Sequence, residues 1–262
     1  MTQMANPSPA QPLVDLVIPV LNEAHVLEKS VTTVREFMAG YPDVRWRVVV
    51  VDNGSTDGTD LVAIKLTERW SDVRFVQLPQ RGRGRALRHA WTQSEADVMC
   101  YTDVDLSTEL AALPRMVHSI LDDGYDVSTG SRLMRESRTQ RKFKRDFISR
   151  TYNIFIKIVL FTSFSDAQCG FKAVSKKAVA ELVPQIVDQS WFFDTELLVL
   201  AEKQGYRIKD IPVTWIEDDD SRVKIAKTAW EDIKGVFRLR LKLWREMFVP
   251  SAQRAAVKRA AS

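Results

Sequence analysis

The sequence has few cysteines and histidines and no long apolar run, so it lacks the marks of disulfide-rich, zinc-finger or membrane-spanning proteins. Only two of its 262 residues are cysteines, Cys100 and Cys169, and they lie far apart. We therefore expect no disulfide framework, and a reducing compartment fits the chain. Its three histidines lack the spacing of metal ligands. No stretch reaches the ~18 uninterrupted apolar residues that a membrane-spanning helix needs.

The N-terminal segment also lacks the apolar core of a signal peptide. It reads MTQMANPSPAQP, which is polar and rich in proline, so we expect a short disordered lead over residues 1–12. The overall composition, with 45% hydrophobic and 27% charged residues, suits a globular domain with a full core. We expect this domain over residues 13–220, followed by a basic amphipathic helix and tail over residues 221–262.

Positive charge is unevenly distributed along the chain. The net charge is only +4, but residues 132–150 and 222–262 are basic, while acids gather at residues 103–105 and 217–220. Basic regions of this kind bind nucleic acid, anionic lipid or a phosphorylated substrate. The basic runs lack the interleaved aromatic residues and the recognisable module of single-strand binders, so we expect no nucleic-acid partner.

Apolar runs alternate with helical patterns through the first half of the chain. Residues 14–20, 46–51 and 73–78 are short apolar runs, and the segments between them repeat apolar residues at helical spacing. Uniformly apolar runs such as WRVVVV are typical of central parallel strands. The alternation predicts a mostly parallel, doubly wound α/β sheet that is flanked by helices and has right-handed crossovers.

Two carboxylates follow the next buried strand, in the sequence ADVMCYTDVDLS. Asp103 and Asp105 are separated by one residue, so on a strand their side chains point to the same side. In an open parallel sheet, ligands bind where the strands have their carboxyl ends. The pair, with Ser107 beyond it, suits Mg²⁺ or Mn²⁺, which keeps positions open for substrate phosphate oxygens. The alternative is a surface turn with two solvated acids.

A glycine-rich basic segment, RGRGRALRHAW, opens another helix after the third strand. Glycines such as Gly82 let backbone amides approach a ligand, and Arg81, Arg83 and Arg85 make that approach cationic. A flexible solvated loop explains the same pattern, so the segment alone does not establish phosphate binding.

The pattern changes after residue 132. Residues 132–146 are polar and basic, and we expect a mobile loop there. The segment 147–164 is apolar but interrupted by charged residues, which predicts an amphipathic helix against the core or a membrane surface. Further on we expect a helix from Trp191, a strand over residues 206–215 and a long helix over residues 227–249.

Taken in order, the motifs IPVLNE, VVDNGSTDGT, RGRGRAL and DVDLS resemble the inverting family-2 glycosyltransferases of GT-A fold, over roughly residues 13–245. The motifs GSR, DAQCGFK and WFFDTELL in the second half are similar to those of polyprenyl-phosphate hexosyltransferases. They are most similar to the dolichyl-phosphate β-glucosyltransferases, with the dolichyl-phosphate mannose synthases as a neighbouring group. The resemblance implies a single GT-A domain that moves a hexose from a nucleoside diphosphate to a polyprenyl or dolichyl phosphate. Glucose from UDP-glucose is the sugar implied; mannose from GDP-mannose and a saccharide acceptor are the alternatives.

The resemblance also assigns the nucleotide and metal positions. Residues of the family that hold the nucleotide are matched by Pro19, Asn22, Glu23, Asp52 and the glycine-loop residue Gly82. Asp103 and Asp105 match the acids around a divalent metal ion and the diphosphate. Ser107 stands where mannose synthases have a glutamine ligand.

On the acceptor side, Arg132 matches the arginine of the GSR motif. Arg145 and Ser149 fall near the arginine and serine that grip the acceptor phosphate, in a variable region. A phosphate is already anionic and needs no general base, whereas an alcohol acceptor does. We expect Asp194 to hold a sugar hydroxyl, to orient an arginine or, for a saccharide acceptor, to act as that base. As the alternative, Asp194 and Glu196 simply favour the dipole of their helix.

The sequence lacks the transmembrane helices of many relatives, so we expect peripheral association with the cytoplasmic face of a membrane, directly or through a membrane protein. The apolar residues expected at the lipid are Phe155, Ile158, Val159, Phe161, Trp230, Phe237 and Trp244. Lys157, Arg238 and Lys242 are expected to be among the cations that reach lipid phosphates.

Overall fold

The computed structural model describes residues 11–140, 143–216 and 225–247. Most of the predicted lead, the acidic residues 217–220 and the C-terminal tail lie outside these residues. The expected boundaries of the lead, the domain and the tail therefore stay predictions.

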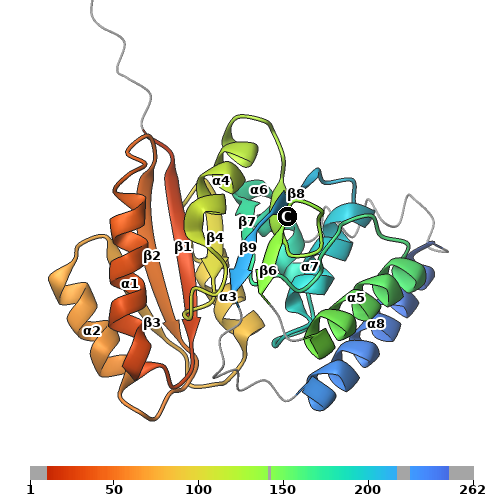
Figure 1. The fold of residues 1–262 in the computed structure, drawn as a ribbon, viewed down its shortest axis with the longest axis horizontal. Helices are drawn as coiled ribbons and strands as arrows, with labels where there is room; N and C mark the ends of the chain where they lie inside the picture. The colour runs from red at the N-terminus through yellow and green to blue at the C-terminus, as the bar shows by residue number, and fades with distance from the viewer. Residues whose placement is uncertain (1–10, 141–142, 217–224, 248–262) are drawn as a thin grey trace, which may run out of the picture.

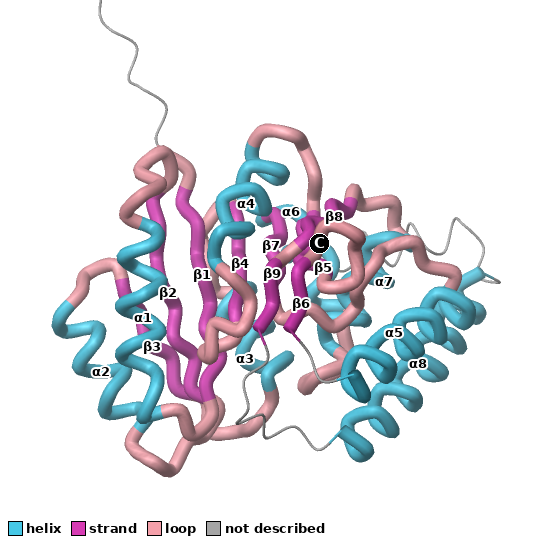
Figure 2. Tube along the Cα trace, in the orientation of Figure 1, coloured by secondary structure: helices cyan, strands magenta, loops and turns pink. Residues whose placement is uncertain are grey.

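Seven strands form one sheet in the order β3-β2-β1-β4-β7-β5-β8 (Figures 1 and 2). The strands are β1 (Leu13–Val20), β2 (Arg45–Asp52), β3 (Val73–Gln77), β4 (Val98–Thr102), β5 (Val127–Ser131), β7 (Phe171–Ser175) and β8 (Ile208–Pro212). All neighbours are parallel except β7, which runs antiparallel between β4 and β5. The predicted mostly parallel α/β sheet is confirmed.

Helices cover both faces of this sheet. Leu16 and Ile18 of β1 face a core shared with α1 (Ala24–Met38), α2 (Thr59–Arg69) and α4 (Leu113–Leu121). Val17, on the opposite side of the same strand, faces the second core. That core is shared with α3 (Arg83–Thr92), α5 (Phe143–Leu160), α6 (Lys176–Leu182), α7 (Phe193–Lys203) and α8 (Ile225–Met247). The strand alternation of β1 thus divides the apolar residues between two layers.

Two short 3₁₀ helices, η1 (Leu110–Ala112) and η2 (Val183–Gln185), precede α4 and follow α6. Pro114 lies in the first turn of α4, where its missing N–H has no consequence.

The region expected to be a mobile loop is more ordered than predicted. β6 (Arg138–Gln140) pairs with β9 (Thr214–Ile216) in a separate two-stranded parallel sheet, and α5 begins at Phe143 rather than at Phe147. The single strand expected over residues 206–215 is divided between β8 and β9.

α5 and α8 lie side by side at one end of the molecule (Figure 1). The ring centroids of Phe155 and Phe237 are 6.2 Å apart at their contact. Among the residues that the structure describes, every helix is too short or too polar to span a bilayer.

Candidate active site

The candidate site lies at the edge of the sheet where three parallel neighbours end. β1, β2 and β4 end at Val20, Asp52 and Thr102. Since parallel strands have their carboxyl ends at the same edge, the loops that follow them come together there.

Asp52 occupies the deepest position among these loops. Its side chain is fully buried, and its Oδ1 accepts hydrogen bonds from the backbone N–H (3.0 Å) and the hydroxyl of Ser55. Its Oδ2 is buried and finds no donor among the residues that the structure describes. An unpaired buried acceptor is destabilising by about 1–3 kcal/mol. A ligand N–H or O–H would remove that penalty, which fits the nucleotide role implied by the resemblance.

Asn22 connects the first loop to the loop of Asp52. Its backbone N–H donates to the Ser55 hydroxyl, and its Oδ1 accepts from the N–H of Thr56, both at 2.8 Å. Its φ of 58° lies in the left-handed region, which asparagine tolerates better than most residues. Glu23 follows Asn22, and Pro19 pairs with β2 three residues earlier. The structure thus brings the four predicted nucleotide residues of β1 and β2 to one pair of loops.

The two acids predicted at the end of a strand lie in the turn beyond it. β4 ends at Thr102, and the N–H of Leu106 then donates to the carbonyl of Asp103 (3.2 Å). The expectation that strand alternation aligns the two carboxylates is therefore wrong, because neither acid belongs to the strand. Asp105 is exposed, and its Oδ1 accepts the N–H of Ser107 at 2.9 Å.

Asp103 lies in a crowded anionic environment. A Cβ at Gly170 would collide with its carboxylate, although solvent still reaches 42% of the side chain. Burial raises the pKa of Asp103 to about 6, the carboxylates of Asp105 and Asp194 add to the rise, and nearby arginines oppose it. A positive charge placed between these acids would stabilise their ionised forms.

Asp103 and Asp105 fit a hard divalent cation that takes its remaining ligands from a substrate. In the described part of the chain, no group of three or more histidine, cysteine or acidic side chains could hold a metal ion alone. Mg²⁺ and Mn²⁺ sites with one or two carboxylates usually complete their coordination with phosphate oxygens and water. The donor set therefore suits a metal ion that binds together with a diphosphate.

Arg83, the first residue of α3, is the central cation of the site. It forms ion pairs with Asp194 and, at 3.5 Å, with Asp103. One guanidinium nitrogen also donates to the Tyr101 hydroxyl at 2.7 Å, and the group lies 4.7 Å from the ring of Trp191. The sequence marked this arginine only as one of three cations in a glycine loop.

Asp194 is enclosed by groups of the protein. Its side chain is 2% exposed and its Oδ2 pairs with Arg83. Its Oδ1 accepts from the Tyr101 hydroxyl at 2.6 Å and lies 3.4 Å from Nζ of the buried Lys172. A general base needs a lone pair that can reach the substrate proton. These contacts favour the expectation that Asp194 orients an arginine over the expectation that it acts as a base.

Arg132 is held by Asp166, which is fully buried. Nε and Nη2 of Arg132 donate to the two carboxylate oxygens at 2.7 and 3.0 Å, and its backbone N–H donates at 3.1 Å. Arg132 also lowers the pKa of Asp103 electrostatically, so its charge acts on the acid turn. The predicted acceptor arginine and Arg83 thus both stabilise the ionised form of Asp103.

The other two residues predicted to bind the acceptor phosphate, Arg145 and Ser149, belong to α5. The side chain of Arg145 lies outside the described residues. Ser149 is half-buried on α5, one turn before Asn153, whose Oδ1 accepts the N–H of Ala167 at 2.8 Å. Residues four apart share a helix face, so Ser149 is on the side of α5 that faces the loop of Asp166.

The glycine loop contacts another protein segment. Gly82 has φ +147°, and a Cβ on it would collide with the carbonyl of Gln189. The N–H groups of Gly84 and Arg85 donate to the carbonyls of Ser190 and Gln189 at 3.2 and 3.0 Å. The expectation that these amides approach a ligand is not met for Gly84 and Arg85, and a ligand contact of Gly82 stays a prediction.

Four residues of the site were not among the predicted site residues: Arg83, Tyr101, Asp166 and Lys172. Asp166 and Lys172 open and close the DAQCGFK motif, which was the available signal. Tyr101 reads as an ordinary strand residue, and only the fold brings it to Asp194.

The sequence pattern of a single known family covers most of this arrangement. The family described as Glycosyl transferase family 2 matches residues 15–183, which is more than half of the chain. The chain belongs to glycosyl transferase family 2. The match includes the acid turn, Arg132 and the loop of Asp166, whereas α7 and α8 lie beyond it.

Curated relatives within family 2 give a narrower likeness. The glycosyltransferase AglD of Haloferax volcanii is 34% identical over 238 residues, which is 90% of this chain. The chain spans only 38% of the length of AglD. A dolichyl-phosphate β-glucosyltransferase of Saccharomyces cerevisiae is 26% identical, over 86% of this chain and 73% of that protein.

A solved structure confirms the family-2 fold. Glucosyl-3-phosphoglycerate synthase of Mycobacterium tuberculosis, determined with Mn²⁺, UDP and glucosyl-3-phosphoglycerate, has a TM-score of 0.66 to this chain. It covers 87% of this chain and 80% of that one at 18% identity. The TM-score of 0.66 confirms the expected GT-A fold.

Proposed function

We propose that this chain transfers a hexose from a nucleoside diphosphate sugar to a polyprenyl phosphate, with inversion at the anomeric carbon. Relatives named dolichyl-phosphate β-glucosyltransferase support this acceptor class. The observation that carries the proposal is the enclosure of Asp194 by groups of the protein. The acid that would serve an alcohol acceptor as base is enclosed by Arg83, Lys172 and Tyr101, while an arginine suited to phosphate flanks the acid turn.

The reaction suits such a site because a phosphate monoester carries its own nucleophilic oxygen. An alcohol must lose a proton as it attacks, whereas a phosphate oxygen attacks in line without that help. The remaining difficulty is charge, since an anionic acceptor must approach an anionic donor. On the acceptor side, Arg132 would offset the repulsion between the two anions, because a guanidinium binds two phosphate oxygens at once.

On the donor side, Asp52 and the loop of Asn22 and Glu23 would hold the nucleoside, with Pro19 and Gly82 beside them. Asp103 and Asp105 would hold Mg²⁺ or Mn²⁺ against the diphosphate. When bound there, the ion would neutralise charge that develops on the departing diphosphate. Arg83, fixed by Asp194, would add a permanent positive charge next to Asp103.

UDP-glucose is our proposed donor, because the similar protein of Saccharomyces cerevisiae is named a glucosyltransferase. GDP-mannose is the second candidate, since sugars change readily within one fold. A thermal-shift series with UDP- and GDP-sugars and Mn²⁺ would rank the two nucleotides.

An extraction assay tests the proposal directly. The protein is incubated with Mg²⁺, a polyprenyl phosphate and radiolabelled UDP-glucose or GDP-mannose, and the label is partitioned between organic and aqueous phases. Label in the organic phase that depends on the lipid phosphate is the expected result. Label transferred only to a water-soluble saccharide would contradict the acceptor class and restore a base role for Asp194.

We further propose that α5 and α8 bring the site to an anionic membrane surface, on the cytoplasmic face. The outer sides of the two helices expose large apolar residues: Phe147, Ile148, Ile154, Ile158, Phe161, Trp230, Phe237, Leu241 and Trp244. Cations lie among them, with Arg240 4.9 Å from the ring of Phe161 and Lys234 5.2 Å from that of Trp230. Such a mixed face is typical of helices that bind in the plane of a lipid headgroup layer.

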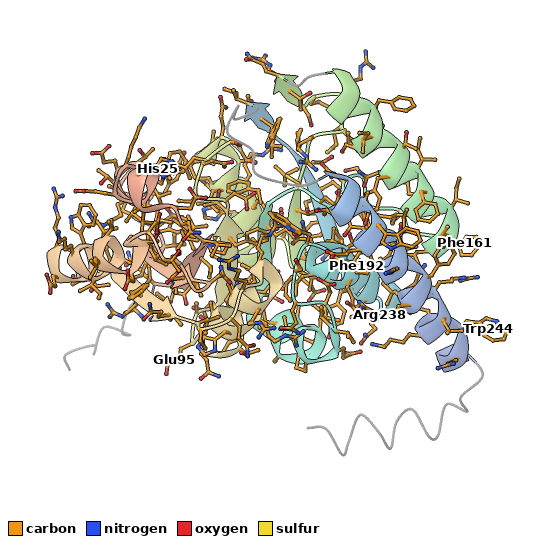
Figure 3. The ribbon with its side chains drawn as sticks, turned by 90° about the horizontal axis from the view of Figure 1, so that it is seen from below. His25, Glu95, Phe161, Phe192, Arg238 and Trp244 are labelled. Atoms are coloured by element: carbon orange, nitrogen blue, oxygen red, sulfur yellow. The ribbon has the colours of Figure 1, made fainter. Side chains whose placement is uncertain are left out.

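Two of the cations predicted for that surface point elsewhere. Arg238 pairs with the buried Glu196 at 2.8 Å, and Nζ of Lys242 donates to the carbonyl of Gln185 at 3.2 Å. The expectation that these two side chains contact lipid is wrong, because both lie on the side of α8 that packs against the rest of the molecule. Figure 3 shows Arg238 on this inner side, whereas Phe161 and Trp244 lie at the outer end of the helix pair.

A further inference from the structure

The inner side of α8 contacts the body of the molecule at Asp232, Gly235 and Arg238. These residues are three apart and therefore follow one side of the helix. Gly235 lies so close to the ring of Phe192 that a Cβ on it would collide. The guanidinium of Arg238 is 5.8 Å from the same ring (Figure 3). The helix is thus seated in a fixed rotation about its axis.

Asp232 reaches the loop between α5 and β7. Its side chain is buried, and its Oδ2 accepts a hydrogen bond from Nε2 of Gln168 at 2.5 Å. On the other side of the loop, Oδ1 of Asn153 on α5 accepts the N–H of Ala167 at 2.8 Å. The two helices therefore hold adjacent residues of one loop.

The same loop carries the partner of Arg132. The backbone N–H of Gln168 donates to Oδ1 of Asp166 at 3.2 Å, and Asp166 binds Arg132 through both carboxylate oxygens. A continuous series of hydrogen bonds thus runs from Asp232 through Gln168 and Asp166 to the guanidinium. Asp166 uses Nε and Nη2 of that group, so, as far as the described residues go, Nη1 and the second N–H of Nη2 can serve a ligand.

We propose that Asp232 is a positioning residue for transfer: through Gln168 and Asp166 it fixes the direction in which Arg132 presents its free edge to the acceptor phosphate. The inference rests on the proposed function, because it assigns that phosphate to Arg132. Bidentate recognition depends on the orientation of the guanidinium as well as on its charge. A displacement of about 1 Å in such a contact can lower a rate by roughly a hundredfold.

Steady-state kinetics with the full chain test the proposal. We expect Asp232→Ala and Gln168→Ala each to raise the KM for polyprenyl phosphate about tenfold, with the KM for the donor within about twofold of wild type. The double variant should be no worse than the poorer single variant, because both changes break one series of bonds. Asp232→Asn keeps an oxygen for Gln168 and should behave like wild type. Glu231→Ala, the same type of change at the neighbouring exposed acid, is the matched control.

Equal rises in the two KM values, or additive effects in the double variant, would show that Asp232 supports the fold as a whole and would overturn the positioning role. If Asp232→Ala does not fold, Gln168→Ala, at a half-buried residue, carries the test. Melting temperatures of all variants separate lost stability from a misdirected arginine.

A chemical probe keeps this test independent of the reaction. Phenylglyoxal modifies accessible arginines, and peptide mass spectrometry gives the rate for Arg132 itself. We expect this rate to rise severalfold in Asp232→Ala and Gln168→Ala but not in Asp232→Asn or Glu231→Ala. If wild-type protein glycosylates no lipid phosphate, the proposed function fails while this measurement still decides the link to Arg132. An unchanged rate in both alanine variants rejects the link.

Discussion

The carboxylates of the site divide into those that face a ligand and those that hold a cation of the protein. Asp166 and Asp194 are buried and bind Arg132 and Arg83. Asp105 is exposed and is bonded to the N–H of Ser107, so it is the acid best placed to meet a metal ion from solution. This division follows from three-dimensional contacts, because all the acids look alike in the sequence.

Removing the charge of Asp105 should remove most of the activity. We expect Asp105→Ala to lower kcat at least about a hundredfold and Asp105→Asn to be nearly as poor, because the amide keeps the shape but loses the charge that attracts a divalent cation. The measurement is hexose transfer across a Mg²⁺ and Mn²⁺ titration. Glu109→Gln, at an exposed acid four residues away, is the control. Wild-type activity that survives EDTA would contradict a metal-dependent reaction.

Replacing Arg132 by lysine separates charge from geometry. Lysine keeps the positive charge but cannot bind Asp166 and a phosphate in one plane. We expect kcat/KM for the lipid phosphate to fall by roughly ten- to a hundredfold, since charge-assisted hydrogen bonds are worth about 1.5–3 kcal/mol. Donor binding, measured by thermal shift with UDP-glucose, should change little. Weaker donor binding instead would move Arg132 to the diphosphate side.

At the scale of residues, the sequence predicts the acids and arginines of the motifs but not their partners. Asp52, Asp103 and Arg132 lie at the candidate site, and the roles that the resemblance implies for them stay predictions. The interpretation of Asp194 stayed open because its neighbours Tyr101 and Lys172 come from β4 and β7, far away in the chain. A side chain's role depends on such neighbours, and spacing along a chain does not reveal them.

At the scale of elements, the seating of α8 can be tested through a substitution that should stabilise an isolated helix. Alanine has a higher helix propensity than glycine by about 1 kcal/mol. At Gly235 the added Cβ would meet the ring of Phe192, and overpacking of this kind is destabilising by about 1–3 kcal/mol. We therefore expect Gly235→Ala to lower the melting temperature by several degrees. Lys234→Ala, at the exposed neighbour, should leave it unchanged; a rise in Gly235→Ala would show that α8 is not seated as described.

The contact of α8 at Asp232 should also make stability depend on pH. Burial raises the pKa of Asp232 to about 7, the charges of Asp188 and Glu231 add to the rise, and the hydrogen bond with Gln168 opposes it. The unfolded chain ionises this carboxyl near the usual value of 3.8, so folding loses stability as pH rises from about 4 to about 7 and no further above that. Asp232→Asn removes this dependence while it keeps the hydrogen bond.

We therefore expect Asp232→Asn to raise the melting temperature more at pH 8 than at pH 5. A tenfold change in an ionisation constant is worth about 1.4 kcal/mol, which gives a gain of several degrees at the higher pH for a chain of this size. Differential scanning fluorimetry at both pH values measures it. Equal gains at pH 5 and pH 8 would show that Asp232 ionises in the folded protein as it does in solution.

The elements themselves were predictable where they are long or uniformly apolar. The runs that became β1 and β2 bury both faces, and their composition is that of central parallel strands. β6 and β9 have three residues each, and they pair across more than seventy positions of the chain. No local sequence pattern therefore predicts them. The antiparallel direction of β7 was also hidden, because direction within a sheet depends on the path of the connections.

At the scale of the whole molecule, the helices with the exposed apolar face are the ones that hold the loop of Asp166, the residue that binds Arg132. Asn153 of α5 and Asp232 of α8 bind that loop, while the outer sides of the two helices carry Ile158 and Trp244. A polyprenyl phosphate keeps its chain in the bilayer and its phosphate at the surface. A site next to this helix pair would receive the phosphate without extracting the chain from the lipid.

This arrangement predicts salt-sensitive binding of the protein to anionic liposomes. Lys234 and Arg240 belong to the outer cations of α8, and each basic side chain near an anionic surface contributes on the order of 1 kcal/mol. We expect Lys234→Glu with Arg240→Glu to reduce co-sedimentation at least about tenfold. Lys29→Glu with Lys65→Glu changes the net charge equally on α1 and α2, which lie at the opposite end of the molecule from α8 (Figure 1), and should bind like wild type. Reversing Arg238 and Lys242 would mainly break contacts with Glu196 and Gln185 and lower stability. If wild-type protein stays in the supernatant at low salt, the helix pair does not meet lipid directly, and a membrane protein must bring the acceptor to the site.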